Sequence, residues 1–328
     1  MRICVVGAGA IGGHLAVRLA QAKHAVSIVV RPPTRDAVER DGLTLVAGNV
    51  ESNARVHAVT STSELHPHDV VFVTLKATAL AAIADQLDPL LGPKTPIVFV
   101  LNGIPWWYFH SDSQAARPRP TLEGLDPDGA LSRHVDVARV IGCVVFSSNE
   151  VIAPGVVRNR SINRNEWTLG EIDGALSDRV EAFGAMLTDA GLNATASPHI
   201  RRAVWNKLVA TNIGRAPLCA LLDRDSSVFE NADLKSLAQA IMVEAMEVAS
   251  AWDIHLEIDT EAAFKPGGLT AGHVPSLLQD YRLGRKMEIE AMIGSVQEFA
   301  RSADVRTPNI DVVAALLKQR AIDRGLYP

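Results

Sequence analysis

The sequence has 328 residues, of which 48% are hydrophobic and 21% charged, and its formal net charge is −5. This length and composition are typical of a globular protein with two domains, each with its own core. The negative charge argues against nucleic acid or an anionic membrane as partner, and no apolar run approaches the ~18 residues of a membrane-spanning helix. We therefore expect a cytoplasmic protein with small-molecule ligands.

The three cysteines, Cys4, Cys143 and Cys219, are far apart and include no CxxC pair. This spacing suggests neither a disulfide framework nor a zinc site. We expect buried free thiols and no bound metal.

The opening stretch, MRICVVGAGAIGG, predicts a strand, a glycine turn and a helix. In a GxGxxG pattern after a strand, Gly7 permits the tight turn, Gly9 lets a pyrophosphate approach the backbone, and Gly12 lets the helix pack closely on the strand. The amides of the helix N-terminus then face the phosphates. The alternative is a plain chain reversal, but the flanks favour a dinucleotide site. Its predicted residues are Gly7, Ala8, Gly9, Ala10, Ile11 and Gly12.

A second strand is predicted over residues 25–30, and it ends at Arg31. A fold that prefers NAD usually has Asp or Glu here, about 20 residues past the glycines, to hold the ribose 2′-hydroxyl. A guanidinium suits a 2′-phosphate instead, and Arg35 follows closely. The position therefore predicts NADPH, the alternative being that Arg31 is a solvated loop residue.

Two nearly continuous apolar runs, residues 69–75 and 97–101, are typical of buried central strands in a parallel sheet. Lys76 follows the first run, before a helical pattern over 79–90, and Asn102 follows the second. Lys76 is alternatively a solvated charge, and Asn102 a turn former. Because ligands of open α/β sheets bind outside the carboxyl ends of strands, we expect one crevice formed by four strand ends. These are Gly7, Arg31, Lys76 and Asn102.

Residues 111–133 are rich in Pro, Gly, Asp and Ser and predict an inserted loop. The aromatic run 106–109 before it either lines a pocket or anchors the loop on the core. Strand patterns then return, and residues 166–170 are predicted to form the last strand of the first domain. We expect a Rossmann-type α/β domain over residues 1–173.

Beyond residue 177 the apolar period becomes 3.6, which predicts an all-α second domain over residues 174–328. The expected helices span residues 179–190, 199–213, 234–252, 274–301 and 309–324.

Lys207 lies within a largely apolar helical stretch. A partly desolvated lysine has a lowered pKa and donates a proton near neutral pH, whereas a snorkelling lysine keeps its head in water. Glu288 and Glu290 alternate with apolar residues, so either at least one faces inward or both lie on a solvated helix face. Lys207 is therefore a candidate catalytic residue, and Glu288 and Glu290 are candidate inward-facing carboxylates.

Several motifs together resemble the ketopantoate reductase (2-dehydropantoate 2-reductase) family, over nearly the whole chain. They are GAGAIG at 7–12, Arg31, TLKA at 74–77, LNG at 101–103, IRRAVWNKL at 200–208, and SLLQD with RKMEIE within 276–290. The resemblance implies a Rossmann-type domain, then a helical domain, with the active site in the cleft between them.

The resemblance also implies a reaction, in which NADPH delivers hydride to the carbonyl carbon of a 2-oxo acid. Ketopantoate would become (R)-pantoate for pantothenate synthesis. Lys207 would protonate or hydrogen-bond the oxygen on which negative charge develops. Glu288 would bind the substrate hydroxyl and orient Lys207, Ser276 would bind the carboxylate region, and Lys76 and Asn102 would lie beside the nicotinamide and the substrate. Monomers and homodimers both occur in the family.

The chain departs from the family on the substrate side. Where the family has asparagine one turn after the lysine, Thr211 stands here and Asn212 follows, so either the helix carries an insertion or threonine has replaced asparagine. Arg215 or Ala216 takes the place of a second asparagine, and an arginine there suits the carboxylate of a different oxo acid. Further family asparagines are replaced near Ser226 and Ser227 and at Ile293.

The predicted substrate-binding residues are Asn102, Thr211, Asn212, Arg215, Ser276 and Glu288. Two alternatives remain beside ketopantoate reduction. One is a paralogous reductase of another oxo acid or an imine, and the other is a non-catalytic NADPH-binding sensor.

Overall fold

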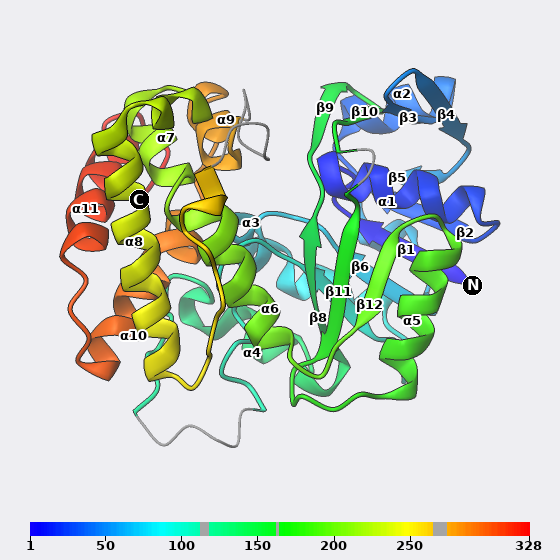
Figure 1. The fold of residues 1–328 in the computed structure, drawn as a ribbon. Helices are drawn as coiled ribbons and strands as arrows, with labels where there is room; N and C mark the ends of the chain where they lie inside the picture. The colour runs from blue at the N-terminus through cyan, green and yellow to red at the C-terminus, as the bar shows by residue number, and fades with distance from the viewer. Residues whose placement is uncertain (112–117, 162–163, 265–273) are drawn as a thin grey trace. The chain divides into compact units, whose positions relative to one another are not determined.

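The structure, a computed structural model, describes residues 1–111, 118–161, 164–264 and 274–328. Its contacts divide the chain into two compact units (Figure 1). Unit 1 comprises Met1–Leu101 and Gly129–Ile200, and unit 2 comprises Asn102–Asp128 and Arg201–Pro328. An α/β sheet unit and a helical unit confirm the predicted fold class.

The main sheet of unit 1 has eight strands in the order β12-β11-β8-β7-β6-β1-β2-β5. All neighbouring strands run parallel except the pair of β8 and β11. The strands are β1 (Arg2–Val6), β2 (Ala25–Val29), β5 (His57–Val59), β6 (Val70–Val73), β7 (Ile97–Val100), β8 (Val140–Phe146), β11 (Glu166–Glu171) and β12 (Asn193–Ala196). Because β6 and β7 are buried along their whole length, the two apolar runs form central strands as predicted.

Helix α1 (Ala10–Gln21) packs on both the main sheet and a smaller, four-stranded sheet of order β4-β3-β10-β9. The smaller sheet contains β3 (Leu43–Ala47), β4 (Val50–Ala54), β9 (Asn149–Ala153) and β10 (Val156–Asn159). A Cβ at Gly13 would lie 2.6 Å from Cγ2 of Val157. A glycine on α1 therefore brings the helix close to β10.

The remaining helices of unit 1 are short or peripheral. They are α2 (Pro32–Asp41), α3 (Ala77–Leu80), α4 (Ala130–His134) and α5 (Asp178–Asp189). The helix predicted over 79–90 is largely a 3₁₀ helix, Ala81–Leu90, that continues α3. The stretch 111–133, predicted as a loop, contains α4 near its end, and its residues 112–117 lie outside the described residues.

Unit 1 extends to Ile200, beyond the predicted boundary between residues 173 and 174. Helix α5 packs on β11 and β12, and β12 pairs in parallel with β11, so residues 166–170 are not the last strand. The sequence of β12, NATA, is polar and only partly buried. A short polar edge strand has no apolar run or alternation, and the sequence pattern therefore missed it.

Unit 2 is built from six α-helices of the described chain and two π-helical turns. The helices are α6 (Ile200–Lys207), α7 (Ala216–Leu222), α8 (Ala232–Ala251), α9 (Ser276–Arg282), α10 (Ser295–Ala303) and α11 (Pro308–Ile322), and the π-turns are Leu208–Ile213 and Glu290–Gly294. Within this unit α7 packs on α9 and α11, and α8 packs on α10 and α11 (Figure 1). Among the described residues, no helix combines the length and apolarity needed to cross a bilayer.

The single long helix predicted over 274–301 is wrong. Helix α9 ends at Arg282, and Gly284 adopts a left-handed backbone conformation with a φ of +62°. This conformation is incompatible with a continuing right-handed helix. The chain then runs without helical structure through Glu288 before the second π-turn begins.

The segment Asn102–Asp128 belongs to unit 2 because α6 holds it. The Arg201 guanidinium donates to the carbonyls of Tyr108 and His110 at 2.8 and 2.9 Å, and Trp205 Nε1 donates to the Tyr108 hydroxyl at 2.7 Å. Phe109 stacks on Phe299. Of the two alternatives for the aromatic run, the anchoring role agrees with these contacts.

Candidate active site

The glycine turn of unit 1 is held by its backbone and by Thr74. Gly7 has a φ of +93°, its N–H donates to Val29 O at 3.0 Å, and its carbonyl accepts from the Thr74 hydroxyl at 2.7 Å. A Cβ at Gly12 would lie 2.2 Å from Thr74 Oγ1. A glycine is therefore required at position 7 by the positive φ and at position 12 by close packing.

Gly9 differs from these two glycines because its Cβ direction is open. A Cβ there would have no neighbour closer than the Gly7 carbonyl at 4.0 Å, and the residue is exposed at the N-cap of α1. The open side at a helix N-terminus fits the close approach of a phosphate. Sequence reasoning did not assign a role to Thr74, although it begins the TLKA motif.

Arg31 is the N-cap residue of α2, two residues after the end of β2, and it is exposed. Across the described ranges its guanidinium forms neither a hydrogen bond nor an ion pair with another residue. Arg35, by contrast, donates to Asp36 Oδ1 at 2.9 and 2.7 Å. Arg31 is therefore the arginine available to a ligand, whereas Arg35 already has a carboxylate partner. Lys76 is half-buried at the N-cap of α3.

Lys207 is the last residue of α6, and its Nζ donates to Asn102 Oδ1 at 2.5 Å. The two residues are 105 positions apart and both belong to unit 2. A hydrogen bond from an ammonium group is short and strong because the charge assists it. The structure thus brings together two site residues that the sequence predicted from separate motifs.

Gly103 explains why the chain can pass so close to the second π-turn. It has a φ of +71°, and a Cβ there would lie 2.0 Å from Ala291 O. The neighbouring Ile104 N–H donates to the same carbonyl at 2.8 Å. The loop after Asn102 therefore packs against the second π-turn, which begins two residues after Glu288. Glu288 is itself buried, with 4% of the residue exposed. The two π-turns also pack against each other.

The first π-turn bears on the choice between Thr211 and Asn212. The Thr211 hydroxyl donates to Lys207 O at 2.8 Å and lies 3.1 Å from Asn212 Oδ1. A π-turn carries one residue more than an α-turn, so Asn212 is the residue one turn beyond Lys207. The Nδ2 atom of Asn212 is buried and has no hydrogen-bond partner among the described residues. The geometry therefore agrees with an insertion in the helix.

Comparison with known proteins shows which family has this sequence. A family model described as ketopantoate reductase PanE/ApbA matches residues 3–106, and the model of the C-terminal part of the same family matches residues 199–321. The chain belongs to the ketopantoate reductase family. The 2-dehydropantoate 2-reductase of Mesorhizobium japonicum is 37% identical over 100% of both chains. That of Halobacterium salinarum is 28% identical and covers 97% of this chain and 98% of its own.

Solved structures of ketopantoate reductases have the same fold. The 2-dehydropantoate 2-reductase of Geobacter metallireducens aligns with a TM-score of 0.82 at 26% identity, covering 97% of this chain and 99% of its own. That of Methylococcus capsulatus aligns with a TM-score of 0.79 at 25% identity over 99% and 98%. The chain is an oxidoreductase that acts on a CH–OH group, as its family is.

Within the ketopantoate reductase family, Arg215 is the departure with the most distinctive surroundings. It is 6% exposed, its guanidinium lies 4.7 Å from the Phe264 ring centroid and donates to Ala263 O, and burial lowers its pKa. Its Nε has no hydrogen-bond partner in the described chain. Within the described chain, the partners of the Arg215 guanidinium are thus the Phe264 ring and the Ala263 carbonyl. Ser276, the first residue of α9, is half-buried.

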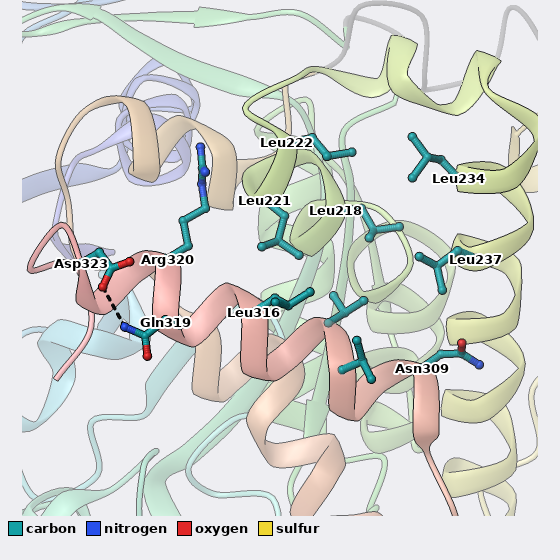
Figure 2. Close-up of a pocket in the computed structure, with 12 residues that line it drawn as sticks. Leu218, Leu221, Leu222, Leu234, Leu237, Asn309, Leu316, Gln319, Arg320 and Asp323 are labelled. Carbon is teal, nitrogen blue, oxygen red and sulfur yellow. Dashed lines mark hydrogen bonds between the residues drawn. The ribbon is translucent and has the colours of Figure 1, made fainter.

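A groove of about 600 Å³ lies elsewhere on unit 2, between α7, α8 and α11. Figure 2 shows leucines of all three helices pointing into it, with the Gln319–Asp323 hydrogen bond of 2.7 Å at one end. None of its lining residues is a predicted site residue. Among the described residues, no group of three or more His, Cys, Asp or Glu is placed to hold a metal ion.

Proposed function

We propose that the protein reduces 2-dehydropantoate (ketopantoate) to (R)-pantoate with NADPH, a step of pantothenate synthesis. The hydrogen bond between Lys207 Nζ and Asn102 Oδ1 is the observation that carries the proposal, because it fixes an ammonium group with a polar partner. When bound, NADPH supplies the hydride. Adding a hydride to carbon and a proton to oxygen converts the carbonyl into the hydroxyl.

Lys207 supplies the proton. As negative charge develops on the carbonyl oxygen, a positioned ammonium group stabilises it and then protonates it. Asn102 accepts one of the three ammonium hydrogens and so limits the directions of the other two. Glu288, a buried carboxylate, is proposed to accept the substrate hydroxyl hydrogen and to orient Lys207.

The glycine turn and Arg31 support NADPH as the cofactor. We assign the pyrophosphate to the N-terminus of α1, beside the open Gly9, and the 2′-phosphate to the guanidinium of Arg31. Lys76 and Asn102 are assigned to the nicotinamide side. Arg31 suits this role because it lacks the carboxylate partner that Arg35 has.

The substrate contacts are assigned to residues of unit 2. Asn212 offers its buried, unpartnered Nδ2 to the substrate, whereas the Thr211 hydroxyl is engaged with the helix backbone. Ser276 is assigned to the carboxylate region. Arg215, whose Nε lacks a partner, favours a second candidate function, the reduction of a different 2-oxo acid or an imine.

A substrate panel with NADPH and NADH side by side tests these assignments. We expect the highest kcat/KM with ketopantoate and NADPH. A higher value with another 2-oxo acid or an imine would favour the second candidate, which Arg215→Ala should then impair selectively. Binding of NADPH without oxidation by any substrate would leave a non-catalytic sensor and overturn the proposal.

We also propose that two copies of the chain pair through the groove of α7, α8 and α11, in the cytoplasm. Leu222, Val312 and Leu316 are 44%, 60% and 56% exposed there. Exposed apolar side chains grouped along one groove suit contact with a second copy of the same surface. A structure titled as a dimeric ketopantoate reductase from Staphylococcus aureus shares the fold at 17% identity. Light scattering should give a dimer that Leu316→Glu dissociates; a monomeric wild type would refute the pairing.

A further inference from the structure

Glu288 lies between two residues that are both held by the chain segment following α11. On one side, the Met287 N–H donates to Leu326 O at 3.0 Å. On the other side, the Glu290 carboxylate accepts a hydrogen bond from the Tyr327 hydroxyl. The backbone just before Glu288 and the side chain two residues after it are therefore both held by neighbouring positions of one segment.

The segment is itself fastened to α11. Gly325 adopts a φ of +66° and turns the chain back, and the Leu326 N–H donates to Ala321 O at 2.8 Å. The Lys318 ammonium lies 5.7 Å from the Tyr327 ring centroid and 2.9 Å from Glu290 Oε1. Helix α11 thus provides both the turn that presents Tyr327 and a cation that holds the same carboxylate.

The Glu290 side chain lies close against two glycines. A Cβ at Gly294 would lie 2.1 Å from Glu290 Oε2, and one at Gly124 would lie 2.8 Å from its Cγ, so two glycines leave just enough space for the side chain. Glu290 also begins the π-turn whose Ala291 carbonyl accepts from Ile104, two residues beyond Asn102. A fixed Glu290 therefore steadies both Glu288 and the loop that carries Asn102.

The stretch before Glu288 needs such support. Residues 283–286 are exposed and non-helical, with Leu283 60% exposed. An exposed, irregular stretch cannot by itself hold the next side chain in one place, because its backbone hydrogen bonds compete with water.

We propose that Tyr327 is a positioning residue that acts through Glu290 to hold Glu288 in its reactive place. The inference rests on the role proposed above for Glu288. The Tyr327 hydroxyl performs no chemistry. It restrains the carboxylate of Glu290, and this in turn restrains the π-turn and Glu288.

Tyr327→Phe tests this proposal because it keeps the ring and removes only the hydroxyl. We expect kcat/KM for the 2-oxo acid to fall about tenfold, as small displacements of catalytic groups do. The KM for NADPH should change less than kcat/KM for the 2-oxo acid, since the residues assigned to its phosphates are in unit 1 and Asn102 is the one unit 2 residue assigned to the nicotinamide side. The matched control is Tyr281→Phe, a buried tyrosine whose ring contacts the guanidinium groups of Arg320 and Arg324. It should leave the kinetics unchanged.

Substitutions of Glu290 separate positioning from general stability. Glu290→Gln keeps an oxygen that accepts from Tyr327 and should retain most of the activity, whereas Glu290→Met loses the contacts with both Tyr327 and Lys318 and should lower kcat/KM at least as much as Tyr327→Phe. The double variant Glu290→Met/Tyr327→Phe should be no worse than Glu290→Met alone, because that variant already removes the contact with Tyr327. Independent, multiplying losses would overturn the proposal.

Hydrogen exchange gives a readout that does not depend on activity. The amides of residues 286–290 should exchange faster in Tyr327→Phe than in the wild type, while those of α8 should not change. Unchanged exchange, or wild-type kinetics for Tyr327→Phe, would overturn the positioning role. If the wild type reduced no 2-oxo acid, the proposed function would fail, and the exchange result alone would still decide whether Tyr327 holds this segment.

Discussion

Replacement of Gly103 by alanine tests the contact between the Asn102 loop and the second π-turn. An alanine at a φ of +71° costs about 1–2 kcal/mol in backbone strain. The new Cβ would also lie 2.0 Å from Ala291 O, a backbone atom that cannot rotate away. Moving it weakens the Ile104 hydrogen bond, at a further cost of about 1 kcal/mol. We expect a total loss of about 2–3 kcal/mol in the free energy of unfolding.

Gly284 provides a matched control for this substitution. Its φ of +62° is nearly the same, but a Cβ there would have no neighbour within 4 Å. Gly284→Ala should therefore cost only the strain, about 1–2 kcal/mol. Urea unfolding followed by circular dichroism gives the difference between the two variants. Equal destabilisation by both substitutions would refute the argument that the approach to Ala291 requires a glycine.

Gly103→Ala should also lower the rate at which the substrate is reduced. Displacing Asn102 changes the hydrogen bond that Lys207 donates to it, and a misplacement of about 1 Å costs up to 100-fold in rate. Stopped-flow measurement of NADPH oxidation separates this effect from cofactor binding, which Gly103→Ala should change less than kcat because the residues assigned to the phosphates are in unit 1. A kcat equal to that of Gly284→Ala would contradict the proposed role of the loop.

Four further outcomes are expected. Lys207→Ala should lower kcat by about 10² or more, since it removes the proton donor, and an unchanged kcat would remove Lys207 from the mechanism. Arg31→Ala should raise the KM for NADPH at least tenfold with little effect on that for NADH; equal effects on both would refute the 2′-phosphate assignment. Glu244 accepts hydrogen bonds from Asn309 N, Asn309 Nδ2 and Ile310 N at 3.0, 2.7 and 2.9 Å. Glu244→Ala should therefore cost about 2–3 kcal/mol of stability, because it leaves amides at the start of α11 unpaired, and Glu244→Gln should cost less. Denaturant titration of both variants checks this order of stabilities. Burial, aided by Arg18, lowers the pKa of His14 to about 4. Between about pH 6.5 and 4 the unfolded chain therefore binds more protons than the folded one, and acidification across this range should lower stability by up to about 3 kcal/mol. A His14→Gln variant whose stability fell with the same slope against pH would contradict this.

Local patterns of the sequence determined much of unit 1. The glycine turn and its helix lie within consecutive residues, so the spacing of Gly7, Gly9 and Gly12 predicted their conformations and packing directly. The buried central strands followed from continuous apolar runs. Arg31 could be found because it lies next to a strand end. Each of these features depends on residues that are neighbours along the chain.

Other features depended on weak or absent local signals. The polar strand β12 has no apolar pattern, so the domain boundary was expected too early. The break after α9 was hidden because Gly284 lies within an otherwise helical pattern. The sequence left open whether Thr211 or Asn212 lies one turn beyond Lys207, since a π-turn and an α-turn differ by one residue. Such choices depend on what packs against the chain.

The candidate catalytic group shows most clearly what only the tertiary structure decided. The motifs predicted Lys207, Glu288 and Asn102 one by one, but their residues gave no sign that the lysine donates to the asparagine. Nor did they indicate that Gly103 must be glycine because Ala291 approaches it, or that Tyr327 reaches Glu290. These contacts join residues far apart in the chain, and packing of the helices brings them together. The sequence by itself determined which side chains are present; the fold of unit 2 decided which of them meet.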